Sequence, residues 1–168
     1  LTYLIIYVPK FDYIQGRIIS FFDRETGTHN FQSDKAIDSI TSGGFFGKGI
    51  GEGILKNRVP EAHTDYIISV ISEEFGVVAI MLILLLFLIF IYMVFKKISF
   101  ETDDKTKLIL IGSISLILMQ ATIHVGVNIR LFPTTGMTLP FLSYGGSSII
   151  STSILAGIIL NLTKRKIN

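Results

Sequence analysis

One uncharged block, residues 75–95, most limits what this chain can fold into. Its run VVAIMLILLLFLIFIYMVF is apolar on every face, and about 20 such residues are enough to cross the hydrocarbon core of a bilayer as a helix. Residues 108–129 form a second uncharged block, and residues 131–163 form a third. Helices in the core of soluble proteins rarely stay apolar all round for this length. The sequence therefore predicts an all-α fold, a polytopic transmembrane helical bundle with spans at 75–95, 108–129 and 148–163.

The third block is not expected to be one continuous helix. Two prolines and a pair of glycines interrupt its first half, so the helix is expected only from residue 148 onward. Residues 130–147 are therefore predicted to be a broken segment at membrane depth, where irregular backbone is tolerated only if protein buries it or water reaches it. This segment is either a re-entrant stretch that lines a cavity or a structural outer loop. Its candidate substrate-binding residues are Ser143, Gly145 and Gly146.

Composition excludes several classes of protein and site. Charged residues make up 17% of the 168 residues, against about a quarter in ordinary soluble domains, so disordered and coiled-coil chains are excluded. The absence of cysteine excludes a disulfide scaffold, a thiolate metal site and a cysteine nucleophile. The three histidines have no partner at metal-ligand spacing, so no metal site built on histidine is expected. Three polar residues inside the second block are expected to face the protein interior: Gln120, His124 and Asn128.

The distribution of positive charge sets the expected orientation. Lysines in the loop 96–107 and the Lys-Arg-Lys run of the tail 164–168 place both segments in the cytoplasm under the positive-inside rule. Residues 9–74 and the broken segment then lie on the extracytoplasmic side. The chain begins with Leu1 rather than Met, and its first residues are apolar. Residues 1–8 are therefore predicted to be the outer end of a truncated span.

The outer segment, residues 9–74, has the composition of a functional loop rather than of a connector. It holds seven Lys or Arg and ten Asp or Glu, and it is longer than most connections. Its glycine-rich stretch SGGFFGKGIGEG, residues 42–53, fails the P-loop pattern, which needs Ser or Thr where Gly49 stands. Two interpretations stay open: a backbone that turns tightly and approaches a ligand, or a flexible, turn-rich loop.

Residues 55–76 carry the most chemistry in this segment. Pro60 breaks any preceding helix, so Thr64 or Asp65 is expected to start the long helix that becomes the first span. Asp65 is either a plain N-cap or a general base, because the positive end of a helix favours an ionised carboxylate. Nearby cations are either contacts for an anionic ligand such as a diphosphate or solvated loop charges. The candidate substrate-binding residues here are Lys56, Arg58, Glu61 and His63.

Two long motifs resemble those of one known family. The pattern P-x-x-G-x-x-L-P-x-x-S-Y-G-G-S-S at residues 133–148 resembles the signature of the SEDS family, which comprises FtsW, RodA and SpoVE. The stretch SGGFFGKGIGEGILKNRVPEAHTDYIISVISEEFG resembles the large extracytoplasmic loop of that family. The resemblance covers nearly the whole chain and corresponds to about the last third of a ten-span protein. The threonine at Thr138, in the stretch GMTLPF, is similar to the pattern of the division member FtsW. Arg130 and Thr135 depart from the usual FtsW pattern.

The resemblance implies a peptidoglycan glycosyltransferase of the bacterial cytoplasmic membrane that polymerises lipid II at the division septum, together with a class B penicillin-binding protein and other division proteins. It implies that Asp65 is the catalytic carboxylate, with Lys56 and Arg58 as cations for the departing diphosphate. A divalent cation, Mg²⁺ or Mn²⁺, between carboxylate and phosphates stays open. Nucleic acid is not an expected partner. The alternatives are a RodA-like elongation polymerase, a lipid II flippase and an inactive scaffold fragment.

Overall fold

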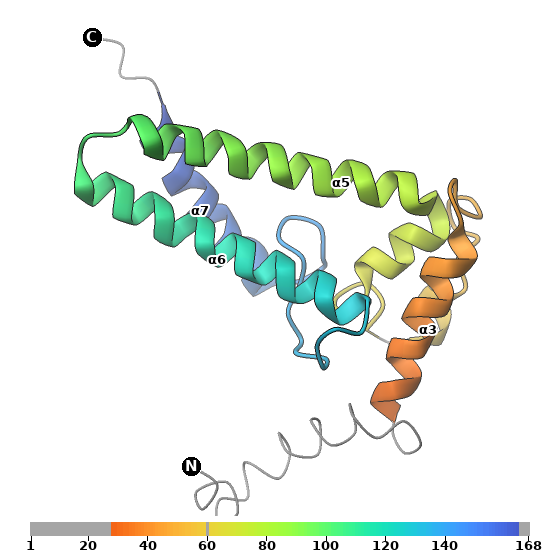
Figure 1. Ribbon diagram of the computed structural model, residues 1–168. Helices are drawn as coiled ribbons and strands as arrows, with labels where there is room; N and C mark the ends of the chain where they lie inside the picture. Colours follow the sequence, from red (N-terminus) through yellow and green to blue (C-terminus); the bar gives the residue numbers. More distant parts are fainter. Residues whose placement is uncertain (1–27, 60, 165–168) are drawn as a thin grey trace, which may run out of the picture.

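The computed structural model describes residues 28–59 and 61–164, with no β-strand among them (Figure 1). The predicted span end at 1–8 and residues 165–168 of the tail lie outside this part. The all-α expectation is confirmed for the described residues. The helices are α3 (Thr28–Gly43), α4 (Leu55–Arg58), α5 (Ile67–Phe100), α6 (Asp104–Asn128) and α7 (Gly146–Thr163).

Three of these helices, α5, α6 and α7, are long and apolar enough to cross a membrane. Only 6% of the most apolar window of α5 is buried inside the structure, and 11% of that of α7. A soluble helix of this composition would be covered by other elements, so these exposed apolar faces are suited to lipid. Figure 1 shows the three helices alongside one another, with α3 across one end of α5.

The connection between α5 and α6 is shorter than the predicted loop 96–107, because both helices extend into its charged sequence. Lys97 in the last turn of α5 forms an ion pair with Glu101 (3.2 Å), and its hydrogen bond lowers the pKa of that carboxyl. Asp103 then caps α6, since its carboxylate accepts hydrogen bonds from Thr106 N–H (3.1 Å) and Thr106 Oγ1 (2.6 Å). The charged residues thus end and begin helices and leave three residues between them.

Buried apolar side chains gather in two separate clusters. One cluster holds the spans together and comprises Val94, Leu110, Ile114, Ile117 and Ile159. The other holds the outer elements α3 and α4 against the beginning of α5 and the end of α6, and comprises Ala36, Leu55, Val59, Ala62, Tyr66, Val70 and Val127. The second cluster fixes the short segment that leads into α5.

The helix α5 is broken at Gly76, where φ is 81° and ψ is −179°. The sequence predicted one uninterrupted helix from Thr64 or Asp65 into the span, and that prediction is wrong at this point. Residues 67–75 form a helical arm outside the break, and the long apolar span follows it. Figure 1 shows the change of direction where α5 meets α3.

The glycine-rich loop after α3 occupies this break. Val77 N–H donates to Gly44 O (2.9 Å), and Lys48 N–H and Gly49 N–H donate to Glu73 O (2.9 Å) and Glu74 O (3.1 Å). A Cβ on Gly76 would lie 2.2 Å from Phe45 O, and one on Gly47 would lie 2.2 Å from Glu74 O. Such an approach is open only to glycine. The loop is therefore a tight backbone connection to α5 rather than a flexible turn.

We expect Gly76→Ala to destabilise the protein by at least about 1–3 kcal/mol, the usual cost of a strained backbone conformation. The added methyl group would also meet the carbonyl of Phe45. The matched control is Gly112→Ala in α6, where a Cβ meets nothing within 4 Å and helix propensity favours alanine by about 0.5–1 kcal/mol. Thermal unfolding in detergent measures both. Equal stability of the two variants would show that the break does not depend on this glycine.

The predicted orientation can be tested with single cysteines, because the chain has none. Ser33 is buried and unsuitable, whereas Thr41 in α3 and Thr102 between α5 and α6 are exposed. In intact cells an impermeant thiol reagent should modify Thr41→Cys and leave Thr102→Cys unmodified until the membrane is opened. The reverse labelling would invert the orientation.

Candidate functional site

Asp65 lies in a turn, residues 61–66, immediately before α5. Its backbone N–H donates to Glu61 O (3.0 Å), and the residue is only 7% exposed. The cap position of α5 is taken by Tyr66, which forms no side-chain cap bond. The N-cap interpretation of Asp65 is therefore wrong. Asp65 lies one residue before the cap.

The side chain of Asn128, at the end of α6, holds this turn from one side. Its amide Nδ2 donates to the backbone oxygens of Asp65 (2.9 Å) and His124 (2.9 Å). Its Oδ1 accepts from the N–H (3.2 Å) and the hydroxyl (2.8 Å) of Ser69 in α5. Asn128 is fully buried. One amide group thus joins α6 to both the turn and the first part of α5.

The segment between α6 and α7 holds the turn from another side. Ser143 Oγ donates to Thr64 O (2.8 Å) and accepts from Leu139 N–H (2.8 Å). The next residue, Tyr144, donates its N–H to His63 O (3.1 Å). The backbone oxygens of three successive residues, 63–65, are therefore hydrogen-bonded to the C-terminal part of the chain. Such satisfaction of buried polar groups fixes the backbone that carries the carboxylate.

Gly136 in the same segment lies beside the carboxylate. A Cβ built on it would lie 4.0 Å from Asp65 Oδ2, and its φ of 71° is in the region that favours glycine. The helix α6 also holds this segment in place, because His124 Nδ1 donates to Met137 O (2.8 Å). The broken segment thus packs against the spans and borders Asp65, as the sequence predicts for irregular backbone buried by protein.

Basic and acidic residues line a small cavity between α3, α4 and α5. Lys48 forms an ion pair with Glu73 (2.9 Å), whose other oxygen accepts from Leu55 N–H (2.9 Å) and so ties α4 to α5. Lys48 and Glu73 line a cavity of about 180 Å³ together with the exposed Arg58 and with Lys35. The side chain of Lys56 lies outside the described residues.

The other predicted site residues have varied surroundings. The side chains of Glu61 and His63 are exposed beside the turn. Gly145 is the N-cap of α7, and a Cβ there would meet Thr138 Cγ2 at 3.2 Å. A Cβ on Gly146 would meet nothing within 4 Å, so there is room for a side chain at this position. Within the described ranges no three His, Asp or Glu side chains gather to hold a metal ion.

Sequence reasoning missed the partners of Asn128 and the role of Glu73. The location of His124 and Asn128 inside an uncharged block did indicate that both face the interior. No pattern linked Asn128 to Ser69, which is 59 residues away in the sequence. Glu73 is only 2% exposed and forms its ion pair with Lys48, which is 25 residues away in the sequence.

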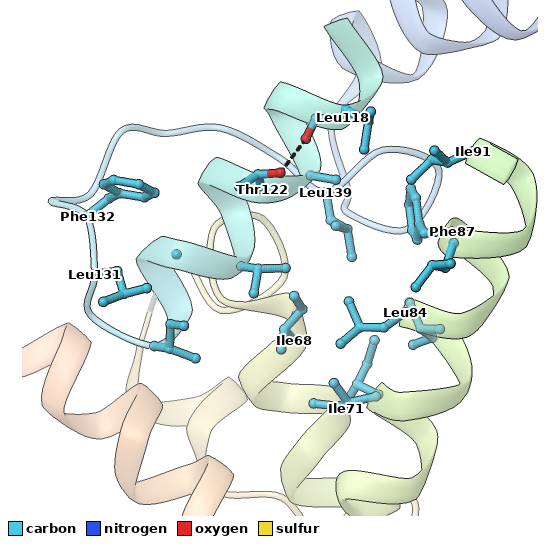
Figure 2. A pocket seen from close by; sticks show the side chains of 17 residues that line it. Ile68, Ile71, Leu84, Phe87, Ile91, Leu118, Thr122, Leu131, Phe132 and Leu139 are labelled. Carbon is cyan, nitrogen blue, oxygen red and sulfur yellow. Dashed lines mark hydrogen bonds between the residues drawn. The ribbon is translucent and has the colours of Figure 1, made fainter. Parts of the chain in front are cut away.

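An apolar cavity of about 500 Å³ opens between α5 and α6 (Figure 2). Figure 2 shows Leu84, Phe87 and Ile91 from α5 facing Leu118 from α6, with Leu139 between them. The hydroxyl of Thr122 is turned to its own helix, where it donates to Leu118 O (2.8 Å). The cavity therefore suits hydrocarbon and offers no group to a charged ligand.

The whole chain, residues 1–168, matches the family model for FtsW, RodA and SpoVE, described as cell cycle protein. The chain belongs to this family. A probable peptidoglycan glycosyltransferase FtsW of Caulobacter vibrioides is 36% identical over 93% of this chain and 40% of the relative. A protein of the same name in Geobacter metallireducens is 35% identical over 98% of the chain and 45% of the relative. The resemblance to the SEDS family is thus confirmed.

A solved chain from a study of how a peptidoglycan synthase complex coordinates polymerization and crosslinking has the same fold. It superposes with a TM-score of 0.72 at 26% identity and covers 96% of this chain. This chain spans 44% of that one and about the same share of the relatives. The similarity therefore describes the part of a SEDS protein that carries the turn with Asp65 and three spans.

We expect Asn128→Ala to lower the free energy of unfolding by about 1–3 kcal/mol, because buried partners of the lost amide stay unpaired. The matched control is Asn161→Ala in α7, where the asparagine is exposed. Thermal unfolding in detergent is the measurement. If both substitutions cost the same, the Asn128 amide does not hold the turn.

Proposed function

We propose that this chain carries the catalytic part of a peptidoglycan glycosyltransferase that polymerises lipid II, a disaccharide peptide linked to undecaprenyl diphosphate, during cell division. The single observation that carries the proposal is the position of Asp65. Its carboxylate belongs to a mostly buried residue, at the outer end of a span, on a backbone whose neighbouring carbonyls are all hydrogen-bonded. Such preorganisation serves a reacting group better than a plain structural residue.

The reaction needs one base and a stabilised leaving group. Asp65 removes the proton from the acceptor sugar hydroxyl as that oxygen bonds to the anomeric carbon of the donor sugar. The bond from that carbon to the diphosphate oxygen breaks, and the diphosphate leaves with its electron pair. Because the diphosphate is already a good leaving group, no second carboxylic acid is needed, unlike in glycoside hydrolysis.

Cations offset the negative charge of the diphosphate. Arg58 is the best candidate, because it is exposed beside the cavity that Lys35 and Lys48 also line. Lys48 already forms an ion pair with the buried Glu73. It therefore stabilises the local fold and also contributes a positive charge to the cavity. We assign Arg58, together with Lys56, to the diphosphate, and Glu61 and His63 to the rim of the acceptor site.

The membrane setting fits a lipid-linked substrate. Three candidate spans keep their apolar faces exposed, and Asp65 lies immediately before the arm that leads into the first of them. The solved relative comes from a synthase complex that couples polymerization to crosslinking. We therefore propose a class B penicillin-binding protein as partner, and the bacterial cytoplasmic membrane at the division septum as location.

The test is Asp65→Asn in the natural gene product, purified with its partner and assayed for lipid II polymerisation. Loss of the base should reduce the rate about 10²–10⁴-fold. The free energy of unfolding should change little, since the amide has the same shape as the carboxylate. The matched control is Glu52→Gln, which removes an exposed carboxylate of the same outer segment and should keep the wild-type rate.

Near-normal polymer from folded Asp65→Asn would overturn the assignment of Asp65. A wild-type protein that moves lipid II across vesicle membranes and forms no polymer would favour the transporter alternative instead.

A further inference from the structure

A second groove, of about 450 Å³, lies between α6, the broken segment and α7. It differs from the apolar cavity between α5 and α6, because many of its lining groups are hydroxyls or amides. None of its lining residues is charged. The lining residues are Leu116, Met119, Gln120, Gly136, Met137, Thr138, Ser147, Ser148, Ser151 and Leu155.

A hydrogen-bonded cluster orders the polar side of this groove. Gln120 Nε2 donates to Thr138 O (2.9 Å) and to Ser148 Oγ (3.0 Å), and Thr138 Oγ1 donates to Ser148 Oγ (2.6 Å). Within the described part of the chain, Gln120 Oε1 and the hydroxyl of the exposed Ser147 form no hydrogen bond. The cluster thus uses the N–H donors of the Gln120 amide. It leaves the amide oxygen of Gln120 and the hydroxyl of Ser147 for a ligand.

One residue that lines the groove lies next to the carboxylate of Asp65. Gly136 lines the groove, and the same glycine lies beside Asp65 Oδ2, which a Cβ would approach to 4.0 Å. A ligand in the groove therefore has one end within reach of the proposed base. The charged cavity lined by Lys48 and Arg58 shares no residue with the groove.

We propose that this groove binds the neutral, hydroxyl- and acetamido-bearing saccharide that accepts the new glycosidic bond. The inference rests on the proposed function. A neutral lining offers nothing to offset a diphosphate, whereas hydroxyls and an amide match sugar hydroxyls and N-acetyl groups. The side chains of Met119, Met137 and Leu155 supply the apolar contacts that sugar C–H faces need. The acceptor sugar and the donor diphosphate thus occupy separate sites.

Chitotriose, a soluble neutral trimer of N-acetylglucosamine, is the probe. Saturation-transfer NMR with the natural gene product in detergent measures its dissociation constant. Gln120→Leu and Ser147→Ala should each weaken binding about three- to tenfold, the effect of one lost hydrogen bond. The matched control is Thr122→Val, two residues along α6, where the hydroxyl bonds its own helix and faces the other cavity. It should bind chitotriose as the wild type does.

Absence of chitotriose binding by the wild type, or unchanged binding in folded Ser147→Ala, would overturn the proposal. Ser147 is exposed, and its hydroxyl forms no hydrogen bond within the described part of the chain, so its removal keeps the test valid where Gln120→Leu fails to fold. Polymer formation without chitotriose binding would refute the assignment of the groove to the acceptor saccharide and leave the proposed function standing. Chitotriose binding with the expected variant pattern, in a protein that forms no polymer, would refute the proposed function alone.

Discussion

The backbone hydrogen bonds between the glycine-rich loop and the break in α5 are the constraint on which the rest of the structure depends. At Gly76 the regular helical hydrogen bonds of α5 are interrupted. Before the break, backbone carbonyls of α5 accept hydrogen bonds from the N–H groups of residues 48 and 49, and after it, N–H groups of α5 donate to the carbonyls of residues 44 and 45. Buried backbone groups without partners are costly, particularly near a bilayer. The break therefore exists only with the loop in place, and the loop in turn anchors α3.

The break also separates two mechanical parts of α5. Beyond it the helix is a candidate membrane span with exposed apolar faces, and before it the arm of residues 67–75 packs with α3 and α4. The arm carries Ser69 and Glu73, whose side chains bond Asn128 and Lys48. Its position is therefore set by α6 on one side and by the glycine-rich loop on the other. The turn that holds Asp65 is fixed together with the arm, because the two are joined directly in the sequence.

The polar groups around Asp65 divide by charge. Side chains from α3, α4 and the glycine-rich loop contribute ions, among them Lys48 and Arg58. Those from α6, the broken segment and α7 contribute neutral amides and hydroxyls, such as Gln120 and Ser147. This division fits the predicted topology, since charges are expensive to desolvate within a membrane, whereas neutral groups are tolerated there when they bond one another.

The sequence by itself determined three candidate spans, the all-α class and the family, because uncharged blocks of that length have few other stable states and the motifs are long. It also indicated Asp65 and the irregular backbone after α6. Only the tertiary structure decided that α5 breaks at Gly76, that Tyr66 rather than Asp65 caps it, and that Asn128 bonds Ser69. Those features depend on backbone groups meeting across many residues, and the identity of a side chain does not encode which distant carbonyl or N–H it will meet.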